Sequence, residues 1–85
     1  MKAGVGEMAP NDPGLTDYDR AHLVTYVRLL DAEASGADWR EAARHLLGAD
    51  PDGRSDAARL SYETHANRAR WMAKEGYLKL LQQGR

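Results

Sequence analysis

The chain has 85 residues, a formal net charge of −1 and 29% charged side chains, a balance typical of a soluble globular domain. It contains no cysteine, which excludes disulfide bonds and thiolate zinc sites. No apolar run approaches the roughly 20 residues that span a bilayer, and the first ten residues lack the apolar stretch of a signal peptide. We therefore expect one small cytoplasmic domain.

The charges are unevenly distributed along the chain. Residues 1–52 carry five basic and ten acidic side chains, whereas residues 53–85 carry seven basic and three acidic ones. An acidic surface favours a basic protein partner, and a basic helix favours phosphate. The charge pattern therefore leaves both a protein partner and a nucleic-acid partner open.

The N-terminal region is predicted to be a tail followed by a helix. Residues 1–15 contain three glycines and two prolines without hydrophobic periodicity, which predicts a flexible tail. Thr16 is a good N-cap residue, with acidic residues in the turn after it. The helix should end at Ser35-Gly36, where glycine can adopt a positive φ. Its core-facing stripe is predicted to be Leu23, Tyr26, Val27, Leu30 and Ala34.

A short second helix is predicted over residues 38–47. Asp38 and Glu41 have the spacing of a capping box, and Gly48 can end the helix. Residues 48–54 read GADPDGR, a sequence rich in turn-forming residues.

A long third helix is predicted over residues 55–75, with Ser55 as its N-cap. At 1.5 Å per residue this helix is roughly 30 Å long. Gly76 lies near its end, and residues 77–81 should continue it with a kink or form a short fourth helix. One face is predicted from residues at steps of three and four, namely Ala58, Tyr62, Ala66, Ala69 and Ala73.

These elements predict an all-α fold, a small three- to four-helix bundle with a long third helix. Residues 16–82 should form a single helical domain, and residues 83–85 should fray. The second helix, the turn and the third helix have the order of a helix-turn-helix unit. Since the turn exceeds the usual three or four residues, we expect an extended-turn variant.

The outward side of the third helix is a candidate nucleic-acid surface. Its basic residues can neutralise phosphates, and its asparagine can read adenine. Glu63 lies among them and would repel the DNA backbone. The same pattern also fits a solvated helix with ordinary i, i+4 ion pairs. The residues of the DNA-binding interpretation are Arg59, Asn67, Arg70 and Lys74.

No catalytic or metal-binding constellation is recognisable. His22, His45 and His65 fall on three different predicted helices, and no HExxH motif is present. The carboxylates stand mostly at the starts of helices, where the helix dipole explains them. We therefore expect no enzymatic activity, no metal, no cofactor, no small-molecule ligand and no membrane association.

Two motifs carry a family resemblance. RLLDAEASGADWREAARHLLG, residues 28–48, is similar to the pattern RLLDGxxAGxSxREIAxxLFG, and ARWMAKEGYLKLL, residues 69–81, is similar to ARxLxxxGYRxLL. In these motifs residues 19–81 resemble the bacterial domain-of-unknown-function family 2285. The resemblance implies transcriptional regulators of mobile elements with an extended-turn helix-turn-helix. It also implies stand-alone antiactivators with an acidic surface, which compete for the N-terminal docking domain of an activator.

We accordingly interpret the chain as a transcriptional antiactivator of excision and transfer genes on a conjugative element, with weak or absent DNA binding. The alternative is a DNA-binding helix-turn-helix regulator. An antiactivator interface should combine an aromatic anchor with a charged rim. The residues expected to bind the partner are Tyr26, Leu30, Asp31, Glu33, Trp71 and Tyr77.

Overall fold

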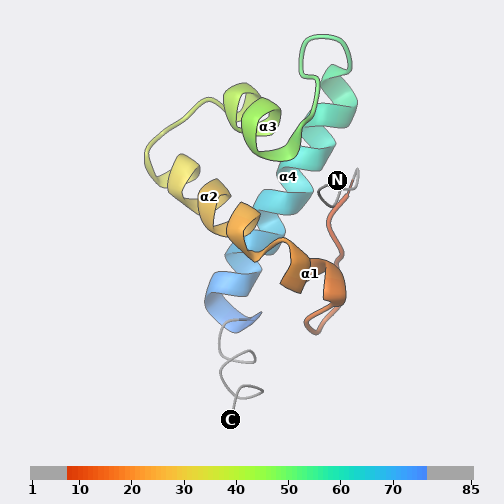
Figure 1. The fold of residues 1–85 in the computed structure, drawn as a ribbon, viewed down its shortest axis with the longest axis vertical. Coiled ribbons are helices and arrows are strands. Elements are labelled where there is room, and N and C mark those ends of the chain that lie inside the picture. Colours follow the sequence, from red (N-terminus) through yellow and green to blue (C-terminus); the bar gives the residue numbers. More distant parts are fainter. Residues whose placement is uncertain (1–7, 77–85) are drawn as a thin grey trace.

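The computed structural model describes residues 8–76, and within them it confirms the all-α fold (Figure 1). Four α-helices follow one another in this part of the chain, and a π-helical turn, η1, extends the last of them. Their bounds are α1 Asp17–Ala21, α2 Leu23–Ala34, α3 Trp39–Leu47, α4 Ser55–Trp71 and η1 Met72–Gly76.

The expected first helix is divided in two by a bend at His22. Thr16 caps α1 as expected, in a complete capping box: its Oγ1 accepts from Asp19 N at 3.1 Å, and its N donates to Asp19 Oδ2 at 3.0 Å. At His22 the backbone leaves the helical region, with φ −118° and ψ 22°. The bend turns α1 toward α4, where Asp19 and Tyr18 find their hydrogen-bond partners.

The buried face of α2 differs from the expected stripe at two positions, since Val27 and Ala34 are both exposed. Tyr26 and Leu29 are buried, while Val27 is 57% exposed. The predictions that Val27 and Ala34 face the core are therefore wrong, and Leu29 takes the place of Val27. The reason is that α2 packs against both α3 and α4. This arrangement centres its buried face between Tyr26 and Leu29.

The ends of α3 agree with the sequence except for one side chain. Asp38 caps the helix by accepting from Arg40 N at 3.1 Å, and Gly48 ends it with φ 67°. The predicted capping box is not formed, because the Glu41 carboxylate instead accepts from Arg44 at 2.9 Å and pairs with His45 at 3.1 Å. Both contacts point along the helix and away from its N-terminus.

The longest helix, α4, is the element on which the others pack (Figure 1). Helices α2 and α3 lie against one side of it, and α1 approaches from the other side. Its N-cap residue is Arg54 without a side-chain cap, so the prediction that Ser55 is the cap is wrong. Ala58, Ala66 and Ala69 are buried as expected, because small side chains allow the neighbouring helices to approach closely.

Two of the residues expected on the small-residue face of α4 are not fully buried. Tyr62 is half-buried and stacks at a tilt on Trp39, with ring centroids 6.1 Å apart. Ala73 is exposed in η1. The predicted continuation over residues 77–81 lies outside the described residues. The central core consists of Tyr26, Leu29, Ala42, Leu47, Ala69 and Met72.

A buried ion pair joins α1 to α4. The Asp19 and Arg68 side chains are 0% and 5% exposed, and Arg68 donates from Nε to Asp19 Oδ1 at 2.9 Å and from Nη2 to Oδ2 at 2.6 Å. Tyr26 Oη also donates to Asp19, at 2.9 Å. Because every carboxylate oxygen has partners, the pair can remain charged in the interior.

The N-terminal segment, residues 8–15, lies along α4 in the part of the chain that the structure describes. Arg68 Nη1 donates to the carbonyl of Asp12 at 2.7 Å, and Nη2 donates to that of Gly14 at 2.8 Å. Ala9 N donates to Thr64 Oγ1 at 3.1 Å. The sequence had assigned these residues to a flexible tail, but here one arginine connects them to Asp19 and the core.

Arg68→Met should lower the free energy of unfolding by about 3–5 kcal/mol, because it leaves the Asp19 carboxylate buried without its counter-ion. This is a large share of the roughly 5–10 kcal/mol available to a domain of this size. Urea denaturation followed by circular dichroism measures the change. Arg28→Met is the matched control on the exposed side of α2, with an expected change within about 0.5 kcal/mol. A loss below about 1 kcal/mol for Arg68→Met would contradict the central role of the pair.

Candidate functional site

Helices α3 and α4, with the turn between them, have the order of a helix-turn-helix unit. The turn over residues 48–54 is closed by its own hydrogen bonds. Arg54 N donates to Asp50 O at 2.8 Å, and Gly53 N donates to Asp50 Oδ1 at 2.9 Å. The turn is therefore ordered despite its length, and it fixes where the exposed face of α4 begins.

The exposed face of α4 begins with a paired arginine. Arg59 Nε donates to Glu63 Oε2 at 2.8 Å, so the i, i+4 pair that the sequence offered is formed. The Arg59 guanidinium also lies 5.0 Å from the ring centroid of Trp39 on α3. A cation–π contact and a carboxylate together hold this side chain against the protein surface.

Farther along α4, Arg70 is held by α2. Its Nε donates to Glu33 Oε1 at 2.9 Å, its Nη2 donates to Glu33 Oε2, and its Nη1 donates to Asn67 Oδ1. The hydrogen bond to Arg70 lowers the pKa of Glu33, and the same bond raises the pKa of Arg70. Of the residues in the DNA-binding interpretation, Arg59, Asn67 and Arg70 are thus engaged within the chain, and Lys74 is exposed in η1.

The N-terminal end of α4, the part of a helix-turn-helix that enters the major groove, is acidic on its surface. Among residues 50–63 the exposed bases are Arg54 and Arg59. The exposed acids in the same stretch are Asp50, Asp52, Asp56 and Glu63. Since affinity for DNA rests largely on neutralised phosphates, this end of α4 disfavours DNA.

Of the six residues expected to bind a partner, the five that lie within residues 8–76 do not form one surface. Tyr26 is 2% exposed, and its hydroxyl donates a hydrogen bond to Asp19. Burial and this hydrogen bond raise the pKa of Tyr26, and we therefore assign the residue to the core. Leu30 is half-buried and Asp31 is exposed on α2. The Glu33 carboxylate forms an ion pair with Arg70. Tyr77 lies outside the described residues.

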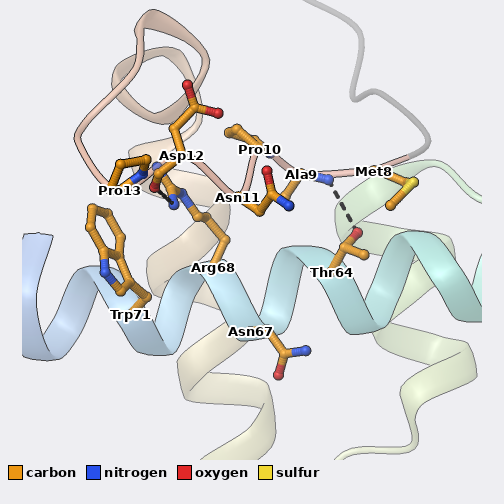
Figure 2. Close-up of a pocket in the computed structure, with 10 residues that line it drawn as sticks. All are labelled: Met8, Ala9, Pro10, Asn11, Asp12, Pro13, Thr64, Asn67, Arg68 and Trp71. Carbon is orange, nitrogen blue, oxygen red and sulfur yellow. Dashed lines mark hydrogen bonds between the residues drawn. The ribbon is translucent and has the colours of Figure 1, made fainter.

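Trp71, the sixth of these residues, lies on a different side of the domain. It is half-buried, and the Arg68 guanidinium stacks 4.0 Å from its ring centroid. With Arg68 and Thr64 it lines a cavity of about 500 Å³ beneath the N-terminal segment (Figure 2). The Asn67 side chain points away from that segment in the same view. The α2 residues and Trp71 are therefore separate candidates.

Two exposed valines were missed by sequence reasoning. Val24 and Val27 are 66% and 57% exposed and stand one helical turn apart on the outer side of α2. With the exposed Arg28 and Asp31 they form what we call the α2 outer face. The available signal was that Leu29 fits the helical stripe as well as Val27, so one of the two had to face outward.

A second buried polar group joins α1 to α4. His65 is 0% exposed; its Nδ1 lies 2.7 Å from the carbonyl of Ser61 and its Nε2 lies 2.5 Å from Tyr18 Oη. A carbonyl only accepts, so Nδ1 carries the proton and Nε2 accepts from tyrosine. Burial lowers the pKa of His65. The hydrogen bond to the Ser61 carbonyl raises this pKa in part, and the neighbouring His22 lowers it.

In residues 8–76 no group of three or more potential ligands is placed to hold a metal ion.

The all-helical domain, with the order α3–turn–α4, has the arrangement of a helix-turn-helix unit. The chain belongs to the family described as "T6SS, Transcription factor, DNA binding domain", which matches residues 2–82. No curated protein matches the chain. The family match establishes a transcription-regulator domain of DNA-binding type, the coarser part of the expected function.

None of the helices within residues 8–76 is sufficiently long and apolar to span a membrane.

Acidification from pH 7.5 to 5 should lower the free energy of unfolding through His65. Its pKa in the folded state lies below the reference value of 6.5, so the unfolded chain binds the proton more tightly. The stabilisation is present above pH 6.5 and is lost as the pH falls below it. Urea titrations at several pH values measure this. His65→Gln should flatten the profile, whereas His45→Gln, on the exposed side of α3, should keep it. An unchanged profile in His65→Gln would assign the dependence to another group.

Proposed function

We propose that this domain regulates transcription by binding a protein, as an antiactivator that occupies the N-terminal docking domain of a transcriptional activator. The observation that carries the proposal is the charge state of the helix-turn-helix surface. Arg59 and Arg70 are paired with carboxylates, and the start of α4 carries more exposed acids than bases. Such a surface keeps the fold of a DNA-binding domain while removing most of its attraction for phosphate.

The α2 outer face is our candidate docking surface. Val24 and Val27 offer apolar area that no described element covers, and the half-buried Leu30 continues it toward the core. Asp31 supplies rim charge. An apolar centre with a charged edge is the usual composition of a protein interface. Competitive docking on such a surface requires no catalysis and no cofactor.

The target genes are proposed from the family resemblance. The chain resembles the stand-alone antiactivators of family 2285, among them QseM of a rhizobial integrative and conjugative element. We therefore propose that it blocks activation of excision and transfer genes. A link to T6SS genes is the corresponding proposal from the family description.

A DNA-binding regulator is the second candidate, and the family match favours it. In that case the contacts would come from the basic side chains of α4 and η1, with Asn67 as the residue that reads a base. Arg59 and Arg70 would have to exchange their carboxylate partners for phosphates.

Fluorescence anisotropy of a labelled duplex should separate the two candidates. We expect no saturable binding near physiological salt and at most weak binding at low salt, because Arg59 and Arg70 of α4 are already paired with carboxylates. The antiactivator proposal would be overturned by tight binding in which the logarithm of the association constant falls with the logarithm of the salt concentration, with a slope of about −0.9 per phosphate contact. It would move Arg59, Asn67, Arg70 and Lys74 into the site.

Val27→Asp should abolish antiactivation without unfolding the domain, because it places a charge at the centre of the α2 outer face while position 27 is solvent-exposed. The measurement is a reporter fused to a promoter that the wild-type chain silences, with circular dichroism as the check of folding. Asp17→Asn, exposed on α1, is the control and should silence normally. Full silencing by folded Val27→Asp would exclude this face as the docking surface.

A further inference from the structure

The contact between Glu33 and Arg70 is the longest-range ion pair on the exposed surface of the described residues. It joins the last turn of α2 to the C-terminal part of α4, 37 positions apart. Both carboxylate oxygens accept from the guanidinium, one from Nε and the other from Nη2. The third nitrogen, Nη1, donates to Asn67. Every nitrogen of Arg70 is therefore engaged.

This geometry matches the way in which arginine binds a phosphate group. The forked donor edge of guanidinium fits the two oxygens of a carboxylate and two oxygens of a phosphate equally well. In a protein–DNA complex an arginine on the exposed face of a recognition helix offers that edge to the backbone. In this chain Glu33 occupies the edge before any nucleic acid arrives.

We propose that Arg70 and Asn67 form a phosphate-binding site for nucleic acid that Glu33 closes from within the chain. The inference deepens the proposed function and rests on it, since it names the residue that keeps the helix-turn-helix surface away from DNA. Lys74 follows about one turn later in η1 and extends the same site. Glu33 thus acts as an internal anion in competition with the DNA backbone.

The closure depends on a specific contact rather than on net charge, and the structure offers a control for this distinction. Asp31 lies on the same helix two positions earlier, is exposed, and carries the same charge, yet it stands on the α2 outer face and away from Arg70. Removing either acid raises the net charge of the chain by one. Only removal of Glu33 releases the donor edge of Arg70.

The test is Glu33→Gln, measured by anisotropy with a labelled random-sequence duplex at about 50 mM salt and again near physiological salt. One added phosphate contact should raise the affinity about tenfold at low salt and should steepen the salt dependence by about 0.9. Glu33 is exposed, so the substitution should leave the fold intact, which circular dichroism verifies. Asp31→Asn should leave both quantities near the wild-type values.

A second variant traces the gain to the proposed site. Glu33→Gln combined with Arg70→Gln should return the affinity to the wild-type value, because the released guanidinium is removed. An equal gain in Asp31→Asn, no gain in Glu33→Gln, or a gain that persists without Arg70 would each overturn the inference. Tight DNA binding by the wild-type chain would instead overturn the proposed function, while the ratio between Glu33→Gln and wild type would still decide the inference.

Discussion

The buried ion pair of Asp19 and Arg68 is the interaction on which the rest of the domain depends. A chain of this size buries little apolar surface, and much of the α4 face is alanine. The pair supplies what the small core lacks, a directional contact that sets the position of α1. It also adds the N-terminal segment to the domain, because the same guanidinium reaches two carbonyls there. One side chain of α4 therefore holds two consecutive segments, residues 8–15 and α1, that lie far from it in the sequence.

The charge asymmetry of the chain acquires a structural meaning in this fold. The acidic first half and the more basic second half meet at Asp19–Arg68 in the interior and at Glu33–Arg70 on the surface. Folding thus pairs two acids of the first half with two bases of the second half. The first pair serves stability because it is buried, whereas the exposed second pair contributes little stability and mainly determines what the surface attracts.

Local signals in the sequence were sufficient for the helices but not for the faces they present. Thr16, Asp38, Gly36 and Gly48 act as predicted because caps and left-handed turns depend on neighbouring residues alone. The bend at His22 and the outward position of Val27 depend on where α1 and α3 pack, which local spacing does not specify. The basic residues of the candidate DNA surface were identified from the sequence. The pairing of Arg70 with Glu33 was not identified, since that pair exists only once α2 lies against α4.

The bonds that hold the N-terminal segment have a consequence for its sequence. Arg68 reaches this segment through the backbone carbonyls of Asp12 and Gly14, and every amino acid has such a carbonyl. A Cβ built on Gly14 would meet no heavy atom within 4 Å. The contacts of Arg68 therefore place no demand on the side chains at positions 12 and 14, whereas Arg68 and Asp19 depend on each other.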